Sequence, residues 1–397
     1  MLKGTVQTTA GLLLAGCTAD SQTIEVILKD GLIKHEHRPL LNKVIKPVLH
    51  KPDPPLDVKI GQMLLVGFQG LTVDQNSAIV RAIHNYHIGN IVLFDKGSQL
   101  GLGRRNISSS DQLHTLTDTL QASSGLPLLI STDQEGGVVN RLKPQYGFPA
   151  SVSAERLGAS NDLNYTYQQS LTMAQTMADV GINLNLAPVV DVNINPNNPI
   201  IARYGRSFSA DPSVVTTHAQ SFIRAHRTKN ILCTLKHFPG HGSSQQDTHK
   251  GFVDVTHTWR NSELIPYEQL IQSGDCDAVM TAHIFNANLD DQLPATLSKP
   301  IITGILRDQL GFDGVVISDD IQMGAIRNHY SFETAIYHAV QAGVDIISIA
   351  NNLTFNRDVS IRAATTIREF VENGSISEER IDQSYQRIMK LKEKLKG

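Results

Sequence analysis

The segment 236–251, KHFPGHGSSQQDTHKG, is well equipped for acid–base chemistry. It contains three histidines, two lysines and an aspartate, interrupted by glycine and proline. It directly follows 231–235, an apolar run of β-prone residues. A strand that ends in a loop rich in titratable groups is a frequent way of presenting catalytic side chains. We therefore take this loop as the centre of a candidate site. The alternative is an ordinary polar surface loop.

Eight apolar runs rich in Val, Ile and Leu recur from residue 60 onward, separated by longer amphipathic or polar segments. Their near-continuous apolar character is typical of parallel strands buried on both faces. Eight such strands favour an α/β fold, a TIM-type (β/α)₈ barrel, over two separate sheets. The clearest helical patterns lie at 332–341 and after Ser377, a plausible N-cap. The predicted strands are Ile60–Phe68, Ile88–Phe94, Leu126–Thr132, Ile182–Val190, Ile231–Leu235, Ala278–Ala282, Gly314–Ser318 and Val344–Ala350.

Conspicuous polar residues follow five of these eight runs. In a (β/α)₈ barrel the catalytic groups lie in the loops after the strands, so we expect these side chains to meet at one end of the barrel. For any one of them, Asp320 in particular, the structural alternative is a helix cap or a loop hydrogen bond. Besides the segment 236–251, they are Asp133, Glu135, Arg141, Asp191, Arg206, His283, Asp319 and Asp320.

Several chemistries compete for such groups. A metal site could draw on the histidines and the aspartate of the loop. However, Pro239 and Gly240 separate His237 from His241, which excludes the helical i, i+4 pairing of HExxH zinc sites. Gly136–Gly137 alone is a weak indication of a phosphate-binding loop, and no Gly-x-Ser-x-Gly elbow is present for acyl transfer. We therefore expect neither a metal nor another cofactor.

Glycoside cleavage fits the residues best. It requires an acid that protonates the leaving oxygen and, in retaining enzymes, a carboxylate nucleophile on the opposite side of the anomeric carbon. Asp319, at the end of a predicted strand, is placed to be rigid and inward-pointing. Asp247 and His249 could form a dyad in which the carboxylate orients the imidazole and supports its cationic form.

Three motifs stand in order along the chain: DQEGG at 133–137, KHFPGHG-x₄-DTH at 236–249 and SDD-x-x-M at 318–323. Together they resemble the signature of the glycoside hydrolase family 3 β-N-acetylhexosaminidases, over about residues 60–397. The resemblance implies a TIM-like barrel in which Asp319 is the nucleophile and Asp247 and His249 are an acid/base dyad on a mobile loop. It also implies five residues that hold the hydroxyls of the N-acetylglucosamine (GlcNAc) ring: Asp133, Arg141, Arg206, Lys236 and His237.

The activity implied is that of a retaining exo-β-N-acetylglucosaminidase, which would release terminal GlcNAc from peptidoglycan-derived fragments through a covalent glycosyl-aspartate. The chain departs from the family at Val138, where relatives often have arginine, and at 243–246, SSQQ. These departures concern sugar contacts and loop closure. We expect a single catalytic domain, without the second domain of many family 3 β-glucosidases. The alternatives are a GlcNAc phosphorylase, another family 3 β-glycosidase, or a catalytically inactive envelope-binding lipoprotein.

The 397-residue chain has a formal net charge of −3 and 18% charged residues. This balance, without a dense Lys/Arg block, argues against nucleic acid as a partner. The expected partner is a GlcNAc-containing glycan or muropeptide, and composition does not indicate an oligomeric state. Cys233 lies in an apolar run and is expected to be a small buried hydrophobic residue.

The N-terminal sequence Leu-Ala-Gly-Cys, ending at Cys17, resembles the lipobox of bacterial lipoproteins. Residues 1–17 would then be a signal peptide and Cys17 a lipidated membrane anchor in the cell envelope. The apolar stretch before Cys17 is short for a secretory signal, so a cytoplasmic protein is the alternative. Residues 18–56 have the composition of a linker or N-terminal arm, and 57–397 are the expected hydrolase domain. No later stretch is apolar enough to span a bilayer.

Overall fold

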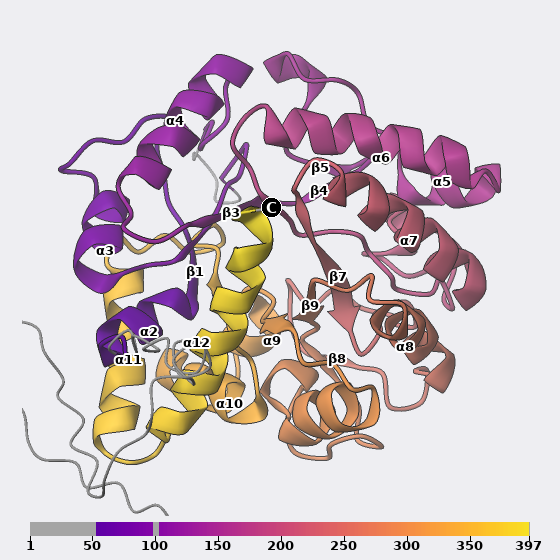
Figure 1. Ribbon diagram of the computed structural model, residues 1–397. Helices are drawn as coiled ribbons and strands as arrows, with labels where there is room; N and C mark the ends of the chain where they lie inside the picture. Colours follow the sequence, from indigo (N-terminus) through magenta and orange to yellow (C-terminus); the bar gives the residue numbers. More distant parts are fainter. Residues whose placement is uncertain (1–52, 98–102, 397) are drawn as a thin grey trace, which may run out of the picture. The chain divides into compact units, whose positions relative to one another are not determined.

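Eight parallel strands form one sheet in the computed structural model, which describes residues 53–97 and 103–396 (Figure 1). They are β1 (Leu64–Gly67), β2 (Asn90–Val92), β3 (Leu129–Thr132), β6 (Leu184–Asn185), β7 (Leu232–Phe238), β9 (Ala278–Thr281), β11 (Val315–Ile317) and β12 (Ile347–Ile349). The order around the sheet is β11, β9, β7, β6, β3, β2, β1, β12. The edge strands β11 and β12 meet through a parallel bridge between Ile317 and Ile346. The sheet therefore closes into the predicted (β/α)₈ barrel.

Helices surround the strands and connect them (Figure 1). They are α2 (Leu56–Gln62), α3 (Ala78–Tyr86), α4 (Ser110–Ala122), α5 (Ala154–Ser160), α6 (Leu163–Ala178), α7 (Pro212–Arg227), α8 (Ile265–Gln272), the π-helix η6 (Pro300–Gln309), α9 (Gly324–Arg327), α10 (Phe332–Ala342), α11 (Val359–Glu372) and α12 (Glu378–Glu393). Short 3₁₀ turns are η2 (Pro144–Tyr146), η3 (Ala202–Tyr204), η4 (Asn261–Leu264), η5 (Ala295–Leu297) and η7 (Lys394–Lys396). Two small sheets pair β4 (Gln134–Gly136) with β5 (Val139–Asn140), and β8 (Val253–Asp254) with β10 (Ile284–Phe285).

All eight predicted strands are present, but none has exactly the predicted boundaries, and three of the differences have a clear physical reason or consequence. Residues 60–62 are the last turn of α2, whose final residues are buried like the strand that follows, so one apolar run spans both elements. The run 182–190 pairs as a strand only at Leu184–Asn185, because Pro188 lacks the N–H that a ladder requires. Strand β7 continues to Phe238, so Lys236 and His237 lie within the strand and not after it.

The helical predictions near the C-terminus are confirmed. Helix α10 covers the predicted segment. Ser377 caps α12, and its hydroxyl accepts a hydrogen bond from the Arg380 N–H. Ile381 and Ile388 of α12 are buried on one face, as the 3.6-residue period requires.

Helix α12 lies across the end of the barrel where the strands begin. Its Arg380 donates a hydrogen bond to the Val344 carbonyl before β12, and its buried Lys392 donates one to the Gly89 carbonyl before β2. This helix closes that end of the barrel. The opposite end, where the strands finish, carries the long connections that follow β3, β6 and β7.

Residues 1–52 lie outside the described residues. They include Cys17 and most of the predicted linker 18–56. The signal peptide, the lipid anchor and the localisation therefore stay predictions. Among residues 53–97 and 103–396, no helix has the length and apolar character needed to cross a membrane. Cys233 is buried in the core, as predicted.

Candidate active site

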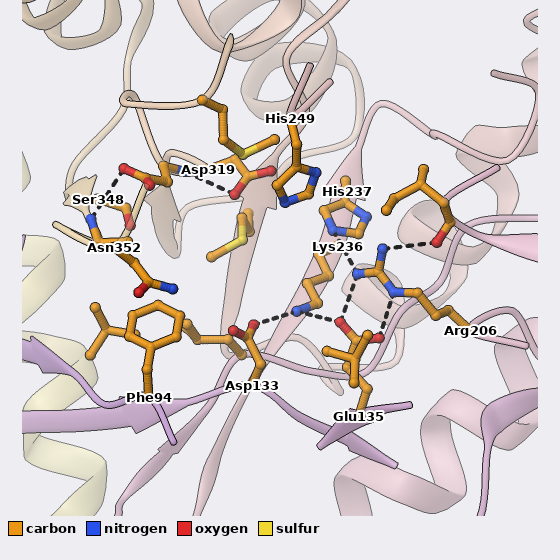
Figure 2. A pocket seen from close by; sticks show the side chains of 18 of the residues that line it. Phe94, Asp133, Glu135, Arg206, Lys236, His237, His249, Asp319, Ser348 and Asn352 are labelled. Atoms are coloured by element: carbon orange, nitrogen blue, oxygen red, sulfur yellow. Dashed lines mark hydrogen bonds and ion pairs between the residues drawn. The ribbon is translucent and has the colours of Figure 1, made fainter. Parts of the chain in front are cut away.

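A pocket of about 300 Å³ lies at the end of the barrel where the strands finish (Figure 2). Side chains from β3, β4, β7, β11 and β12 or from the segments directly after them line it. Asp247 does not line the pocket but contacts His249, which does. The structure therefore brings all eight predicted site residues into one cluster, and their catalytic and binding roles stay predictions. The seven that line the pocket are Asp133, Arg141, Arg206, Lys236, His237, His249 and Asp319.

A chain of alternating charges forms one wall of the pocket. The Lys236 ammonium lies 2.9 Å from an Asp133 oxygen and 2.7 Å from Glu135 Oε1. Arg206 binds both oxygens of Glu135 through Nε and Nη2, each at 2.7 Å. Arg141 donates to the second oxygen of Asp133 at 3.0 Å. Such a network presents both donors and acceptors to ring hydroxyls in fixed positions, which suits a polyhydroxylated ligand.

The charge network also fixes the ionisation of its carboxylates. Burial alone would raise the pKa of Glu135, but the positive charges of Arg206 and Lys236 outweigh it and lower that pKa to about 2. For Asp133, burial is likewise outweighed, by Lys236 and Arg141, and its pKa is lowered. At neutral pH both carboxylates can therefore accept hydrogen bonds but cannot donate them.

Asp191 orients the histidine at the end of β7. Its Oδ2 accepts a hydrogen bond from His237 Nδ1 at 2.7 Å, and its Oδ1 accepts from the backbone N–H groups of His237 and His241. His237 Nε2 lies 3.3 Å from Arg206 Nη2. Since Arg206 can only donate, the network assigns the proton of His237 to Nδ1 and leaves Nε2 an acceptor. Asp191 is fully buried and holds this imidazole in place.

Asp319 lies at the end of β11 and lines the pocket. One of its oxygens accepts a hydrogen bond from the Asp320 N–H at 2.8 Å. Burial alone would raise the pKa of Asp319, but the imidazoles of His283 and His237 outweigh it and lower the pKa. The group is therefore a carboxylate at neutral pH, the form that a nucleophile requires.

His249 lies beside Asp319 at the mouth of the pocket, with its side chain about half exposed (Figure 2). Its Nδ1 lies 2.8 Å from an Asp247 oxygen that also accepts from the His249 N–H. Burial opposes the charged imidazole, but the Asp247 hydrogen bond and the charge of Asp319 outweigh it and raise the pKa of His249. With Nδ1 bound to Asp247, Nε2 is the nitrogen that can exchange a proton in the pocket.

Two other polar residues of the loops after the strands, Asp320 and His241, are buried. Asp320 does not cap α9, which begins after Met323. Its Oδ1 instead accepts from the N–H groups of Gln322 and Ala350. The loop-hydrogen-bond interpretation of Asp320 therefore holds for that oxygen. His241 is buried, which lowers its pKa to about 4, and does not line the pocket. Among the described residues, no group of three His, Cys, Asp or Glu side chains is arranged to hold a metal.

Two residues with clear positions in the site were named among the polar groups after the strands but were given no catalytic or binding role. Glu135 stands in the motif at 133–137, but its partner Arg206 is 71 residues away. Asp191 contacts His237 from 46 residues away. The sequence signal for both was their place after a predicted strand, and for Glu135 also the motif at 133–137. Val138, at a departure from the family pattern, is 61% exposed and lines the pocket.

Replacement of Glu135 by glutamine is expected to lower the free energy of unfolding by about 3 kcal/mol, because it leaves the buried Arg206 without its carboxylate partner and Lys236 with Asp133 alone. Urea denaturation measures the change. The control is Glu333→Gln, which removes a half-exposed pair with Arg362 and should cost less than about 1 kcal/mol. Equal small losses in both variants would show that the Glu135 network is not a stability determinant.

A (β/α)₈ barrel whose pocket joins a carboxylate and an imidazole to a hydroxyl-binding wall has the geometry of a glycoside hydrolase. Residues 55–391 match the model of the glycosyl hydrolase family 3 N terminal domain. The chain therefore belongs to glycosyl hydrolase family 3.

The relatives agree with this assignment. The chain is 33% identical over 338 residues to Beta-hexosaminidase A of Pseudoalteromonas piscicida. This alignment covers 79% of this chain and 54% of that protein. It is 34% identical over 298 residues to a Beta-hexosaminidase of Xylella fastidiosa, and this alignment covers 73% of this chain and 83% of that protein. The structure of a family 3 beta-N-acetylglucosaminidase from Paenibacillus sp. str. FPU-7 superposes with a TM-score of 0.79 at 34% identity, covering 87% of this chain and 63% of that one. The chain thus spans about half the length of the first relative.

Proposed function

We propose that the protein is a retaining exo-β-N-acetylglucosaminidase that hydrolyses terminal β-linked GlcNAc. The observation that carries the proposal is the juxtaposition of Asp319 with the Asp247–His249 pair at the mouth of a pocket walled by buried, ionised hydroxyl-binding groups. The two β-hexosaminidases and the Paenibacillus β-N-acetylglucosaminidase support the choice of sugar.

In the first step, an Asp319 oxygen attacks the anomeric carbon while the bond to the leaving oxygen breaks. Protonated His249 gives its Nε2 proton to that oxygen, and Asp247 stabilises the imidazole throughout. The lowered pKa of Asp319 and the raised pKa of His249 both favour this starting state, with the carboxylate ionised and the imidazole charged. The product is a glycosyl ester on Asp319 and a free alcohol.

In the second step, neutral His249 removes a proton from water, whose oxygen attacks the anomeric carbon and displaces Asp319. Two inversions at the same carbon leave the released GlcNAc in the β configuration. The ring hydroxyls would be held by Asp133, Arg141, Lys236, Arg206 and His237. Their mutual contacts keep these groups in place before the sugar enters, which reduces the entropy that binding costs.

We further propose peptidoglycan-derived fragments as the natural substrate, as in peptidoglycan recycling, because the family resemblance implies GlcNAc-containing cell-wall fragments. If Cys17 is lipidated, the enzyme would act in the cell envelope. If it is not, a cytoplasmic enzyme with the same site would act on imported fragments.

The test is hydrolysis of a chromogenic β-GlcNAc substrate beside the matching β-glucoside, in phosphate and in phosphate-free buffer. We expect turnover of the GlcNAc substrate alone, at the same rate in both buffers and with free GlcNAc as product. Turnover of the β-glucoside would show that the sugar assignment is wrong, and GlcNAc 1-phosphate would identify a phosphorylase. Silence on both substrates would favour the binding-protein alternative.

A further inference from the structure

A buried carboxylate, that of Glu263, lies beneath the segment that carries Asp247 and His249. Glu263 belongs to η4 and its side chain is fully buried. Its Oε2 accepts hydrogen bonds from the N–H groups of Gly242 at 2.9 Å and Ser243 at 3.3 Å. These two N–H groups stand at the start of the catalytic loop, defined here as residues 243–249. The loop therefore begins on a carboxylate that lies outside the pocket.

The chain before the catalytic loop packs closely against this carboxylate. Gly240 has φ +124°, and a Cβ placed on it would lie 2.5 Å from the Cβ of Glu263. A Cβ on Gly242 would lie 1.7 Å from the Val192 carbonyl oxygen. Both positions therefore require glycine. The Glu263 carboxylate bonds the backbone of Gly242 and Ser243 directly, with no side chain between them. A change in these hydrogen bonds therefore changes the position of the loop backbone.

The far end of the catalytic loop rests on backbone that follows Asp319. The carbonyl of His249 accepts a hydrogen bond from the Gly324 N–H at 3.2 Å, and that of Thr248 accepts from the Ala325 N–H at 3.0 Å. Between the two ends, Gln245 and Gln246 are exposed. At its start the loop is held by Glu263, which accepts from its N–H groups, and by Asn195 and Asn198, which donate to the carbonyls of Ser244 and Gly242. At its end it is held by the start of α9.

The titratable groups that face Glu263 keep the same protonation state around neutral pH. Asp191 has a pKa lowered to about 2, His241 has a pKa lowered to about 4, and burial raises the pKa of Tyr267 well above its usual value. Burial and, to a smaller extent, the charge of Asp191 raise the pKa of Glu263 to about 7, against opposing hydrogen bonds from Ser243 and Gly242. Of these four groups, Glu263 is the one that changes charge near pH 7.

We propose that ionised Glu263 is a positioning residue that holds the catalytic loop in the arrangement in which His249 reaches the leaving oxygen, and that its protonation loosens the loop. The proposal rests on the proposed acid/base role of Asp247 and His249. A carboxylate accepts stronger hydrogen bonds from N–H groups than a neutral carboxylic acid does. The N–H groups of Gly242 and Ser243 lower the pKa of Glu263, whereas its burial raises it. An arrangement that loses these two donors while Glu263 stays buried therefore has the higher pKa, and it is favoured as pH falls.

The kinetic test is Glu263→Gln, which keeps the shape and removes the charge. On a substrate with a poor leaving group we expect kcat to fall about tenfold at pH 8, and to approach the wild-type value near pH 5, where Glu263 is itself neutral. On an activated aryl substrate the loss should be small, because departure then needs little acid assistance. In a His249→Ala background the same change should have no further effect. Equal losses on both substrates, or an additive loss without His249, would overturn the proposal.

Trp259 gives a second readout that does not depend on activity. It is the only tryptophan of the chain, and its indole N–H donates to the Pro239 carbonyl at 3.2 Å, directly before the glycines that pack on Glu263. We expect a fluorescence transition near pH 7 that is absent in Glu263→Gln. It should persist in His257→Gln, which removes an exposed histidine two residues from Trp259, and in Glu268→Gln, which removes an exposed glutamate on α8.

The titrations of the wild type and of His257→Gln do not need the Glu263 variant, so they can overturn the proposal even if Glu263→Gln does not fold. A wild type with no transition, or one whose transition disappears in His257→Gln, would overturn the proposal. Either result is independent of whether the enzyme hydrolyses β-GlcNAc substrates, so failure of the loop mechanism and failure of the proposed function can be told apart.

Discussion

Replacing Asp319 by alanine is expected to lower kcat for β-GlcNAc hydrolysis by on the order of 10⁴-fold or more. The variant loses the proposed nucleophile, and among the described residues that line the pocket no other carboxylate is both ionised and free of cationic partners. Asp133 and Glu135 are bound to Lys236, and burial raises the pKa of Asp320 to about 7. Steady-state assays with an aryl β-GlcNAc substrate measure the loss.

Azide gives this variant a sharper readout. A small anionic nucleophile can occupy the space left by the Asp319 carboxylate and attack the anomeric carbon once. A single displacement inverts the centre, so the product should be an α-glycosyl azide and the rate should rise with azide concentration. The control is Asp313→Ala, an exposed aspartate paired with Arg387 at the far side of β11, which should keep wild-type activity. Retention of more than a few per cent of activity in Asp319→Ala would show that another group is the nucleophile.

Replacing His249 by alanine is expected to give a loss that depends on the leaving group. Substrates with poor leaving groups should lose on the order of 10²–10⁴-fold in kcat/KM, the usual contribution of a general acid. Activated aryl substrates should lose far less in this first step, because their oxygen departs without a proton. Hydrolysis of the glycosyl-enzyme would still be slowed, since neutral His249 is the proposed base for the attacking water. Equal losses across leaving groups would contradict the acid role.

The pH profile and the azide product separate His249 from Asp319. A general acid with a raised pKa is active below that pKa and loses its proton as pH rises through it, so the alkaline limb of kcat/KM should disappear in His249→Ala. Azide should intercept the glycosyl-enzyme of this variant and give a β-glycosyl azide, because two displacements restore the configuration. Asp247→Asn should behave like a milder version, since it removes the charge that raises the pKa of the imidazole.

The barrel was predictable from the sequence because its strands are buried on both faces and therefore read as separate apolar runs. The sequence also placed Asp133, Lys236, His249 and Asp319 near one another, since residues at the ends of parallel barrel strands share one face of the fold. The boundaries were less predictable. Residues 60–62 have the same apolar character as the strand that follows, although they belong to a helix.

The supporting residues were harder to find, because their function depends on partners distant in sequence. Asp191 and Glu135 stand after predicted strands among several other polar residues, and only the closed barrel shows that they bind His237 and Arg206. Glu263 lies in a short 3₁₀ turn with no motif around it. A buried glutamate is recognisable only when the chain that covers it, here Gly240 to Ser243, is placed in space.

The most direct measurement is mass spectrometry of the His249→Ala variant after mixing with an activated aryl β-GlcNAc substrate. Loss of the base slows hydrolysis of the intermediate more than its formation, so the protein should gain the mass of one N-acetylhexosamine. Proteolysis should place that mass on the peptide containing Asp319, and wild-type enzyme should release β-configured GlcNAc first. An adduct on any other residue, or a first product in the α configuration, would contradict the assignment of Asp319 as the nucleophile of a retaining glycosidase.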